Sequence, residues 1–220
     1  MCGNFSEIWD AVYCNTLDAA VARAVLREAA GHKWAVGSID IKSAFLNAKL
    51  PEDRVVVVTP PRALVEMGLV TEGQYWLLSR ALYGLRECPR LWDQERDAQL
   101  KHLKVPLSDK EASLVQSVTD PSLWTVTCNG QVLAKLCTYV DDMLVTGPSH
   151  VVHAVLNAIG RLWQSSEPTV LEALDQGQTW RFCGVDVERL ADGGLRLHQK
   201  RYLQDLMAKW GLGEAKPAST

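Results

Sequence analysis

The chain has 220 residues, of which 47% are hydrophobic and 22% are charged. These proportions are ordinary for a globular protein and exclude disorder and fibrous architectures, and the length predicts one large domain or one domain with a small appendage. Lys and Arg number 23 against 26 Asp and Glu, so the net charge is −3, which argues against a simple basic nucleic-acid clamp. A nucleic-acid site in this chain must therefore be local or assisted by metal.

Neither a membrane anchor nor a zinc motif is indicated. No uninterrupted apolar run exceeds the four residues of Val55–Val58, against about 18 for a membrane span, and Met1–Asn15 lacks a basic region followed by an apolar block. The six cysteines are nowhere spaced as zinc pairs usually are, and we interpret them as reduced, buried thiols. The sequence is that expected of a soluble, intracellular protein without membrane contact.

The first half of the chain predicts a helix, a strand and then further short elements. Thr16 is expected to cap a helix that ends near Gly31, and a strand over 34–41 follows. This places Asp40 at a strand end. Short strands are expected at 55–58 and 75–78, and Pro89 is expected to open a helix that runs to about residue 103.

The second half predicts two hairpins, a helix, a third hairpin and a last helix. Asn129-Gly130 suits a tight turn between strands over 124–128 and 131–140. Strand character resumes over 143–146, so a second hairpin carries Asp141-Asp142 at its tip. The remaining elements are a helix over 151–163, a hairpin from strands 182–190 and 195–198, and a helix over 201–210. The fold class is therefore α+β with an antiparallel sheet and packed helices.

Asp40, Asp141 and Asp142 form the candidate catalytic constellation. Adjacent acids repel each other, and a two-residue turn favours Asn or Gly, so stability alone does not explain Asp141-Asp142. One alternative is an exposed, solvated acidic turn, and for Asp40 alone the alternative is a helix cap or turn acid. If the Asp40 strand lies beside the Asp141 hairpin, three carboxylates can hold two divalent cations about 4 Å apart, a geometry suited to phosphoryl transfer.

Three segments in a fixed order carry a family resemblance. They read SIDIKSAFLN at 38–47, ALYGLRECPRLW at 81–92 and YVDDMLVTG at 139–147. Together they closely resemble the reverse transcriptase of copia-type LTR retrotransposons, with weaker echoes at 120–124, 182–187 and 199–203. The resemblance covers about residues 16–220. It implies a right-hand polymerase palm with partial fingers over 16–198 and the start of a thumb or connection, truncated, over 199–220.

The resemblance implies RNA-directed DNA polymerase activity with two Mg²⁺ ions, for which Mn²⁺ can substitute. Its catalytic acids are Asp40, Asp141 and Asp142, and the Ile41 backbone joins them as a metal ligand. The implied nucleotide-binding residues are Lys42, Ser43, Ala44, Phe45, Tyr83 and Gly84, where the segment 41–44 offers backbone N–H groups to the triphosphate and Phe45 excludes the ribose 2′-hydroxyl. The implied template and primer contacts are Leu85, Arg86, Pro89, Tyr139, Val140, Phe182 and Gly184.

Other aromatic residues and two departures from the family pattern also carry expectations. We interpret Tyr75, Trp76, Tyr83 and Trp92 as core residues rather than base-stacking platforms. Met1–Asn15 contains no Lys or Arg, so much of the basic fingers segment is expected to be missing from this edge. Glu87 stands where the family often has Gln, which places an acid near an anionic substrate and is expected to lower its affinity.

The implied partners are an RNA or DNA template with its primer, dNTPs, and the integrase and RNase H domains of a parent polyprotein. The implied location is the cytoplasm, in a virus-like particle, with the nucleus as a second compartment. Two other functions stay open: an inactive relic that keeps the fold and binds primer-template, and a metal-dependent phosphohydrolase. The 81–92 motif has no role in a phosphohydrolase, and release of phosphate instead of pyrophosphate would identify one.

Overall fold

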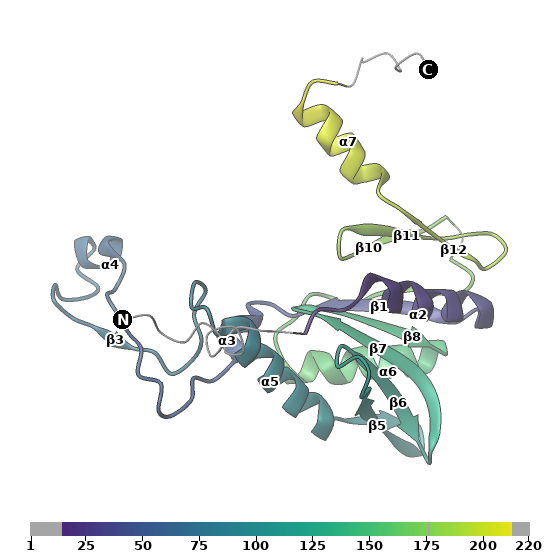
Figure 1. Cartoon of the computed structure of the whole chain (residues 1–220), viewed down its shortest axis with the longest axis horizontal. Coiled ribbons are helices and arrows are strands. Elements are labelled where there is room, and N and C mark those ends of the chain that lie inside the picture. The colour runs from purple at the N-terminus through teal and green to yellow at the C-terminus, as the bar shows by residue number, and fades with distance from the viewer. Residues whose placement is uncertain (1–14, 176, 213–220) are drawn as a thin grey trace.

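A seven-stranded antiparallel sheet forms the centre of the molecule in a computed structural model that describes residues 15–175 and 177–212 (Figure 1). The strand order is β4-β5-β6-β7-β8-β1-β9. The strands are β1 (Ala35–Asp40), β4 (Lys104–Leu107), β5 (Lys110–Gln116), β6 (Leu123–Cys128), β7 (Gln131–Tyr139), β8 (Asp142–Gly147) and β9 (Thr169–Leu171). The expected α+β class with an antiparallel sheet is confirmed.

Two helices cover one face of this sheet. They are α5 (Cys88–His102) and α6 (Ser149–Leu162), and their apolar residues share a core with alternate residues of the central strands, among them Ile39 and Met143. Gly37 permits the close approach of α6, since a Cβ there would lie 2.7 Å from the Leu156 side chain. Strand β8 is buried almost throughout because both of its faces are covered.

The opposite face carries helix α2 (Ala19–His32) and a three-stranded antiparallel sheet. That sheet consists of β10 (Thr179–Phe182), β11 (Val185–Arg189) and β12 (Leu195–His198). A second core joins them to the large sheet through Val36, Cys137 and Leu144. Residues that alternate along β1 and β8 therefore contribute to different cores, as the period of a strand requires.

Two parts project from this body (Figure 1). One holds α4 (Arg62–Glu66) and the pair β2 (Val57–Val58) and β3 (Trp76–Leu77), which is shorter than the expected strands at 55–58 and 75–78. It is joined to the body by α3 (Ala44–Asn47), whose Ala44 is buried in the large core. The other is α7 (Lys200–Lys209), which points away from both sheets in Figure 1 and has no buried residue.

The limits of several elements differ from the expected ones for local reasons. Helix α2 is capped by Asp18 and not by Thr16, since the Asp18 carboxylate accepts a 2.6 Å hydrogen bond from the Ala20 N–H. It ends at His32, beyond Gly31, with Lys33 in the left-handed conformation at φ 53°. The expected strand over 182–190 is interrupted because Cys183 and Gly184 both have positive φ and turn the chain between β10 and β11.

Strands β4, β5 and β9 and the short helices α3 and α4 were not predicted. The hairpin at Asn129-Gly130 is confirmed, with φ values of 49° and 78° at the turn. Within the described residues, no helix has the length and apolar character needed to cross a membrane. Cys88, Cys128, Cys137 and Cys183 are free thiols, although Cys183 is exposed. The expectations for Met1–Asn15 and Cys14 fall almost entirely outside the described residues.

Candidate active site

The two acidic strand ends lie side by side. Asp40, the last residue of β1, is the cross-strand partner of Asp142, the first residue of β8. Both therefore project from the same face of the sheet, which is the face of α2 and the three-stranded sheet, because Val36 and Leu144 precede and follow them at even spacing and belong to that core. Asp141 immediately precedes Asp142. The structure thus brings the three predicted acids together where β1 ends and β8 begins.

The turn that carries these acids is one residue away from its predicted position. Tyr139 pairs with Asp142, so the two turn residues are Val140 and Asp141. Val140 has φ 52°, whereas Asp141 has no positive φ. This is the sign pattern of a type II′ turn, whose first central residue is normally Gly. A β-branched residue in this conformation costs about 1–3 kcal/mol, and the surroundings must hold it there.

Two donors from other elements hold the carbonyl groups of this turn. The Ile41 N–H donates a 2.9 Å hydrogen bond to the Asp141 carbonyl. The Trp92 indole N–H on α5 donates a 2.7 Å hydrogen bond to the Val140 carbonyl. The Trp92 side chain is fully buried, with its ring 5.3 Å from that of Trp163 in an edge-on contact. The turn is thus fixed from the end of β1 and from the helix behind the sheet.

Burial and mutual repulsion raise the pKa values of two of the acids, Asp40 and Asp142. Burial, then the charges of Asp141 and Asp40, raise the pKa of Asp142 to about 6. Burial and the Asp141 charge also raise the pKa of Asp40, and Lys42 opposes this rise. No basic side chain among the described residues forms an ion pair with these three carboxylates. Such a site attracts a cation.

The donor set suits Mg²⁺ by ligand type and by charge. Mg²⁺ binds one or two carboxylates and takes its remaining oxygen ligands from water and phosphate, and a nearby cation lowers the energy of carboxylates that repel each other. In the part of the chain that the structure describes, however, no three His, Cys, Asp or Glu side chains close tightly enough to form a metal cage. The fit therefore rests on the neighbouring strand ends and their electrostatics, not on a finished coordination shell.

The predicted nucleotide-binding residues come from two motifs that lie against each other. The Ala81 N–H donates a 2.9 Å hydrogen bond to the Ala48 carbonyl, and Arg80 donates one of 2.7 Å to the Asn47 carbonyl. The Phe45 ring, half-buried at the end of the first motif, lies 5.2 Å from the ring of exposed Tyr83 in the second. The structure thus brings Phe45 and Tyr83 together.

Part of the expected phosphate cradle is already used for folding. The Ile41 N–H is bonded to Asp141, and the Lys42 N–H donates a 2.9 Å hydrogen bond to the Gln164 carbonyl. These two amides cannot also face a triphosphate, so the expectation for the backbone of 41–44 narrows to Ser43 and Ala44. Ser43, at φ 52°, is the N-cap residue directly before α3. The Lys42 side chain is exposed.

Glu87 has a partner that the sequence did not reveal. The Arg54 guanidinium donates a 2.8 Å hydrogen bond to the Glu87 carboxylate, and this contact lowers the pKa of Glu87. Arg54 comes from the segment before β2. The pair cancels the added negative charge, so the reason for a loss of substrate affinity is weaker than the sequence suggested.

The four aromatic residues that were expected in the core differ in how far they are buried. Trp92 is a core residue as predicted, whereas Tyr75 is 68% exposed and Trp76 is 40% exposed. The core-packing expectation was wrong for these two, because β2 and β3 form only a two-residue pairing. It was also wrong for Tyr83, which is 57% exposed.

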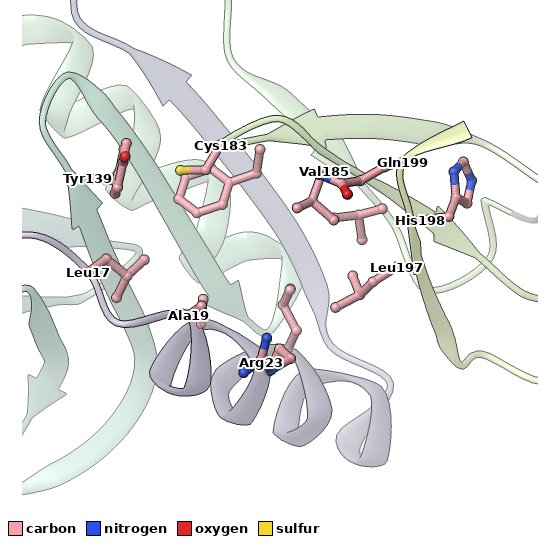
Figure 2. A pocket seen from close by; sticks show the side chains of 13 residues that line it. Leu17, Ala19, Arg23, Tyr139, Cys183, Val185, Leu197, His198 and Gln199 are labelled. Atoms are coloured by element: carbon pink, nitrogen blue, oxygen red, sulfur yellow. The ribbon is translucent and has the colours of Figure 1, made fainter. Parts of the chain in front are cut away.

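Two of the predicted primer contacts, Tyr139 and Phe182, line a cavity of about 520 Å³, whereas Val140 packs against the large core on the other face of the sheet. Figure 2 shows that the walls of this cavity come from α2, from the end of β7 at Tyr139 and from the β10–β12 sheet, including Cys183. Gly184 completes the adjoining turn at φ 77°. Although the Cys183 residue is exposed, surrounding atoms shield its thiol in part, and this desolvation, followed by the charges of Asp142 and Asp141, raises the pKa of Cys183 to about 12, which indicates that this turn lies near the acids.

The remaining predicted contacts lie in the second motif. Leu85 packs against the large core, Arg86 is exposed, and Pro89 stands in the first turn of α5. Gly84 has φ 100° and is exposed, a conformation that favours glycine. These residues lie on the approach to α5, the helix that also supplies Trp92.

Comparisons with known proteins give one consistent family. A family model described as reverse transcriptase (RNA-dependent DNA polymerase) matches residues 4–220. The retrovirus-related Pol polyprotein from transposon RE1 of Arabidopsis thaliana is 29% identical over 199 residues, and that from transposon RE2 of the same plant is 30% identical over 202 residues. Each match covers 90% of this chain and 12% of the polyprotein. The chain therefore spans a small part of these relatives.

A tobacco polyprotein and a telomerase are also similar. The Pol polyprotein from transposon TNT 1-94 of Nicotiana tabacum is 25% identical over 213 residues, which are 96% of this chain and 14% of that protein. A telomerase from Candida albicans, solved with a fragment of telomeric RNA, aligns over 94% of this chain and 41% of its own, with a TM-score of 0.36 and 10% identity. A TM-score at this level does not establish a shared fold.

Proposed function

Because the chain belongs to the reverse transcriptase (RNA-dependent DNA polymerase) family, we propose that it is the polymerase domain of a copia-like retrotransposon. It adds deoxynucleotides to a primer 3′-hydroxyl along an RNA template and releases pyrophosphate. The single observation that carries this proposal is the pairing of Asp40 with Asp142, next to Asp141, where β1 ends and β8 begins.

Asp40, Asp141 and Asp142 hold two Mg²⁺ ions in this proposal, together with the Ile41 backbone. The raised pKa values of Asp40 and Asp142 support it, because they mark carboxylates that lack a neutralising partner. When bound, the ions acidify the attacking hydroxyl and neutralise charge on the leaving pyrophosphate, and Mn²⁺ can substitute for Mg²⁺. The protein itself holds the three carboxylates close together at the ends of β1 and β8, although they repel each other.

The incoming nucleotide lies between the two motifs that meet at Phe45 and Tyr83. Phe45 excludes a ribose 2′-hydroxyl by occupying its position, and Tyr83 with Gly84 lines the sugar and base. Lys42 offers its exposed ammonium to the triphosphate, and Ser43 and Ala44 offer backbone N–H groups. The 5.2 Å contact of the Phe45 and Tyr83 rings supports this arrangement, since it limits how far Phe45 can move aside.

Primer and template pass over the same face as the acids. Tyr139, Val140, Phe182 and Gly184 contact the primer end, where the cavity beside β7 offers an apolar surface. Leu85, Arg86 and Pro89 lie toward the template base. The net charge of −3 does not oppose this, because phosphate is met locally by cations and by bound metal.

The domain limits and the cellular context are proposals of the same kind. Residues 16–198 form the palm with partial fingers, and 199–220 begin the thumb, which agrees with the projection of α7 from the body (Figure 1). The relatives named above are Pol polyproteins. We therefore propose integrase and RNase H domains as partners in a parent chain, inside a cytoplasmic particle and in the nucleus.

Neither alternative function gains support at this site. An inactive relic is not favoured, because the chain retains all three carboxylates of the proposed catalytic site. A phosphohydrolase leaves the 81–92 motif without a role, although the Tyr83 ring of this motif contacts the Phe45 ring of the 38–47 motif.

Primer extension on an RNA template, with dNTPs and either Mg²⁺ or Mn²⁺, tests the proposal. Asp141→Asn is expected to lower the rate at least about 100-fold with the fold preserved, because one ligand charge is lost from a partly exposed turn. Glu111→Gln, which removes an exposed acid on β5, is the control and should extend normally. Equal extension by the wild type and Asp141→Asn would show that this acid is not catalytic.

A further inference from the structure

We propose that Trp92 is a positioning residue for the metal-binding acids. Its indole N–H fixes the Val140 carbonyl and thereby sets the direction in which Asp141 and Asp142 leave the turn. The inference deepens the proposed function and rests on it, because it concerns how the same acids are presented to a divalent cation.

The turn needs an outside constraint to keep its shape. Val140 is at φ 52°, whereas the tight turn of the β6–β7 hairpin, at the other end of β7, uses Asn129 and Gly130 for positive φ. Asn and Gly adopt this conformation readily, and Val does not. A relaxed Val140 would rotate the Val140–Asp141 peptide, and the side chains that follow would change direction with it.

Trp92 supplies that constraint through a buried hydrogen bond to the turn. Its side chain is completely buried, and its indole nitrogen is 2.7 Å from the Val140 oxygen, a short bond for a neutral donor. Trp163 contacts the ring from its edge and limits its rotation. A buried indole N–H without an acceptor is costly, so the indole and the turn hold each other.

The two carbonyl bonds of the turn come from different sides. Ile41 reaches the Asp141 carbonyl from the end of β1, next to Asp40. Trp92 belongs to the core on the opposite face of the sheet from the acids. Trp92 therefore cannot touch a substrate on the acidic face, and its effect must pass through the peptide of Val140.

The test measures Mn²⁺ binding by the 220-residue chain, using electron paramagnetic resonance, alongside primer extension. Trp92→Phe keeps an aromatic ring but removes the donor, and we expect Mn²⁺ affinity to fall about 10-fold. We expect kcat to fall with it while the KM for dNTP changes less than about 2-fold. Trp124→Phe is the matched control, since Trp124 is an equally buried tryptophan on β6 whose indole N–H has no hydrogen-bond partner among the described residues, and its Mn²⁺ affinity should stay within about 2-fold of the wild type.

A second substitution separates positioning from packing. In Trp92→Phe combined with Val140→Gly, the turn accepts positive φ without help, and Mn²⁺ affinity should return to within about 3-fold of that of Val140→Gly alone. If Trp92→Phe does not fold, β-(3-benzothienyl)alanine at position 92 keeps the shape of indole without its N–H and takes its place. A structural role alone predicts a lower melting temperature with unchanged Mn²⁺ affinity, and that result would overturn the inference.

Asp141→Asn distinguishes a failure of this inference from a failure of the proposed function. If the wild type binds Mn²⁺, Asp141→Asn loses it and Trp92→Phe does not, the acids bind metal and Trp92 does not position them. If the wild type and Asp141→Asn bind Mn²⁺ equally weakly, the proposed metal site fails and this inference falls with it.

Discussion

The proposed roles of Phe45 and Asp142 can each be tested by substituting a single side chain. Phe45 stands beside Tyr83, and Asp142 stands opposite Asp40. Each side chain has a proposed role that a small substitution removes without disturbing a fully buried core. The two substitutions test different parts of the site, the sugar pocket and the acidic edge.

Phe45→Ala should let ribonucleotides in. Removing the ring opens space where a 2′-hydroxyl would otherwise collide, so we expect discrimination between dNTP and rNTP, taken as the ratio of kcat/KM values, to fall at least about 10-fold. Leu46→Ala is the control, because Leu46 is the next residue, is 38% exposed and has no proposed contact with the sugar. Sugar discrimination that stays at the wild-type value in Phe45→Ala would remove the gate role.

Asp142→Asn should stabilise the metal-free protein, and only above a certain pH. Because the pKa of Asp142 in the folded state is raised to about 6 from an ordinary 3.8, folded stability is lost as pH rises between these values. Without divalent cations we expect Asp142→Asn to gain about 1 kcal/mol at pH 7.5, after allowance for screening by solvent, and nothing at pH 4.

Urea unfolding in EDTA at the two pH values measures this gain. Asp109→Asn, in the exposed turn between β4 and β5, serves as the matched substitution and should leave the free energy of unfolding unchanged. Added Mg²⁺ should reverse the order and favour the wild type, since it binds the intact acids. A gain that is the same at pH 4 and pH 7.5 would mean that charge repulsion at the acidic edge is not its cause.

Much of the site could be predicted from residue type and motif order, but its local geometry could not. Asp40 at a strand end follows from the strand pattern that precedes it. The shift of the turn to Val140 and Asp141 did not follow, because positive φ at a β-branched residue contradicts the turn preferences that a sequence shows. The Trp92 bond and the Arg54–Glu87 pair join residues 48 and 33 positions apart, and such pairs leave no periodic signal.

At the level of elements, Arg189 links the three-stranded sheet to the large one. Its fully buried guanidinium donates hydrogen bonds of 2.7 Å to the Trp34 carbonyl before β1, of 3.4 Å to the Leu171 carbonyl on β9 and of 3.0 Å to the Gly193 carbonyl between β11 and β12. Burial lowers the pKa of Arg189, with Asp175 and Glu172 opposing this. The position of the proposed primer-contact turn, Phe182 to Gly184, therefore depends on a residue remote from it.

Arg189→Met should loosen the three-stranded sheet before the rest of the molecule. It removes all three hydrogen bonds and takes this donor away from three carbonyl groups, so we expect a loss of about 2–4 kcal/mol in the free energy of unfolding. Hydrogen exchange should quicken in β10, β11 and β12 more than in β7 and β8. Arg196→Met removes a more exposed arginine on β12 that pairs with Glu188, and should cost less than about 1 kcal/mol.

Exchange that quickens equally in both sheets after Arg189→Met would contradict this link. It would mean that the three-stranded sheet unfolds only together with the large sheet, and that Arg189 contributes to overall stability without a specific role in docking.

Element types were easier to predict than element limits. The β6–β7 hairpin and helix α6 follow from strong local patterns, a turn dipeptide and an apolar stripe. Strands β4 and β5 were missed because they contain Lys, Pro and Glu and lie at one edge of the sheet, where pairing with a neighbour outweighs local preference. The break at Cys183-Gly184 was missed because a Cys at φ 47° is uncommon.

For the whole molecule, the fold brings three separated motifs to one place. The segments 38–47, 81–92 and 139–147 meet through the β1–β8 pairing, the contact of the Phe45 and Tyr83 rings and the Trp92–Val140 hydrogen bond. Each link joins two of the motifs, so all three are connected. This convergence of the segments that carry the family resemblance supports one shared site.

The most direct test of the central claim is the stoichiometry of nucleotide addition. The wild-type chain is given an RNA template with an annealed DNA primer, the next complementary dNTP and Mg²⁺, and primer length and released pyrophosphate are both measured. We predict one pyrophosphate for each nucleotide added, and neither product when Asp40 is replaced by Asn. Release of phosphate or mononucleotides without primer growth would contradict the account and point to a phosphohydrolase instead.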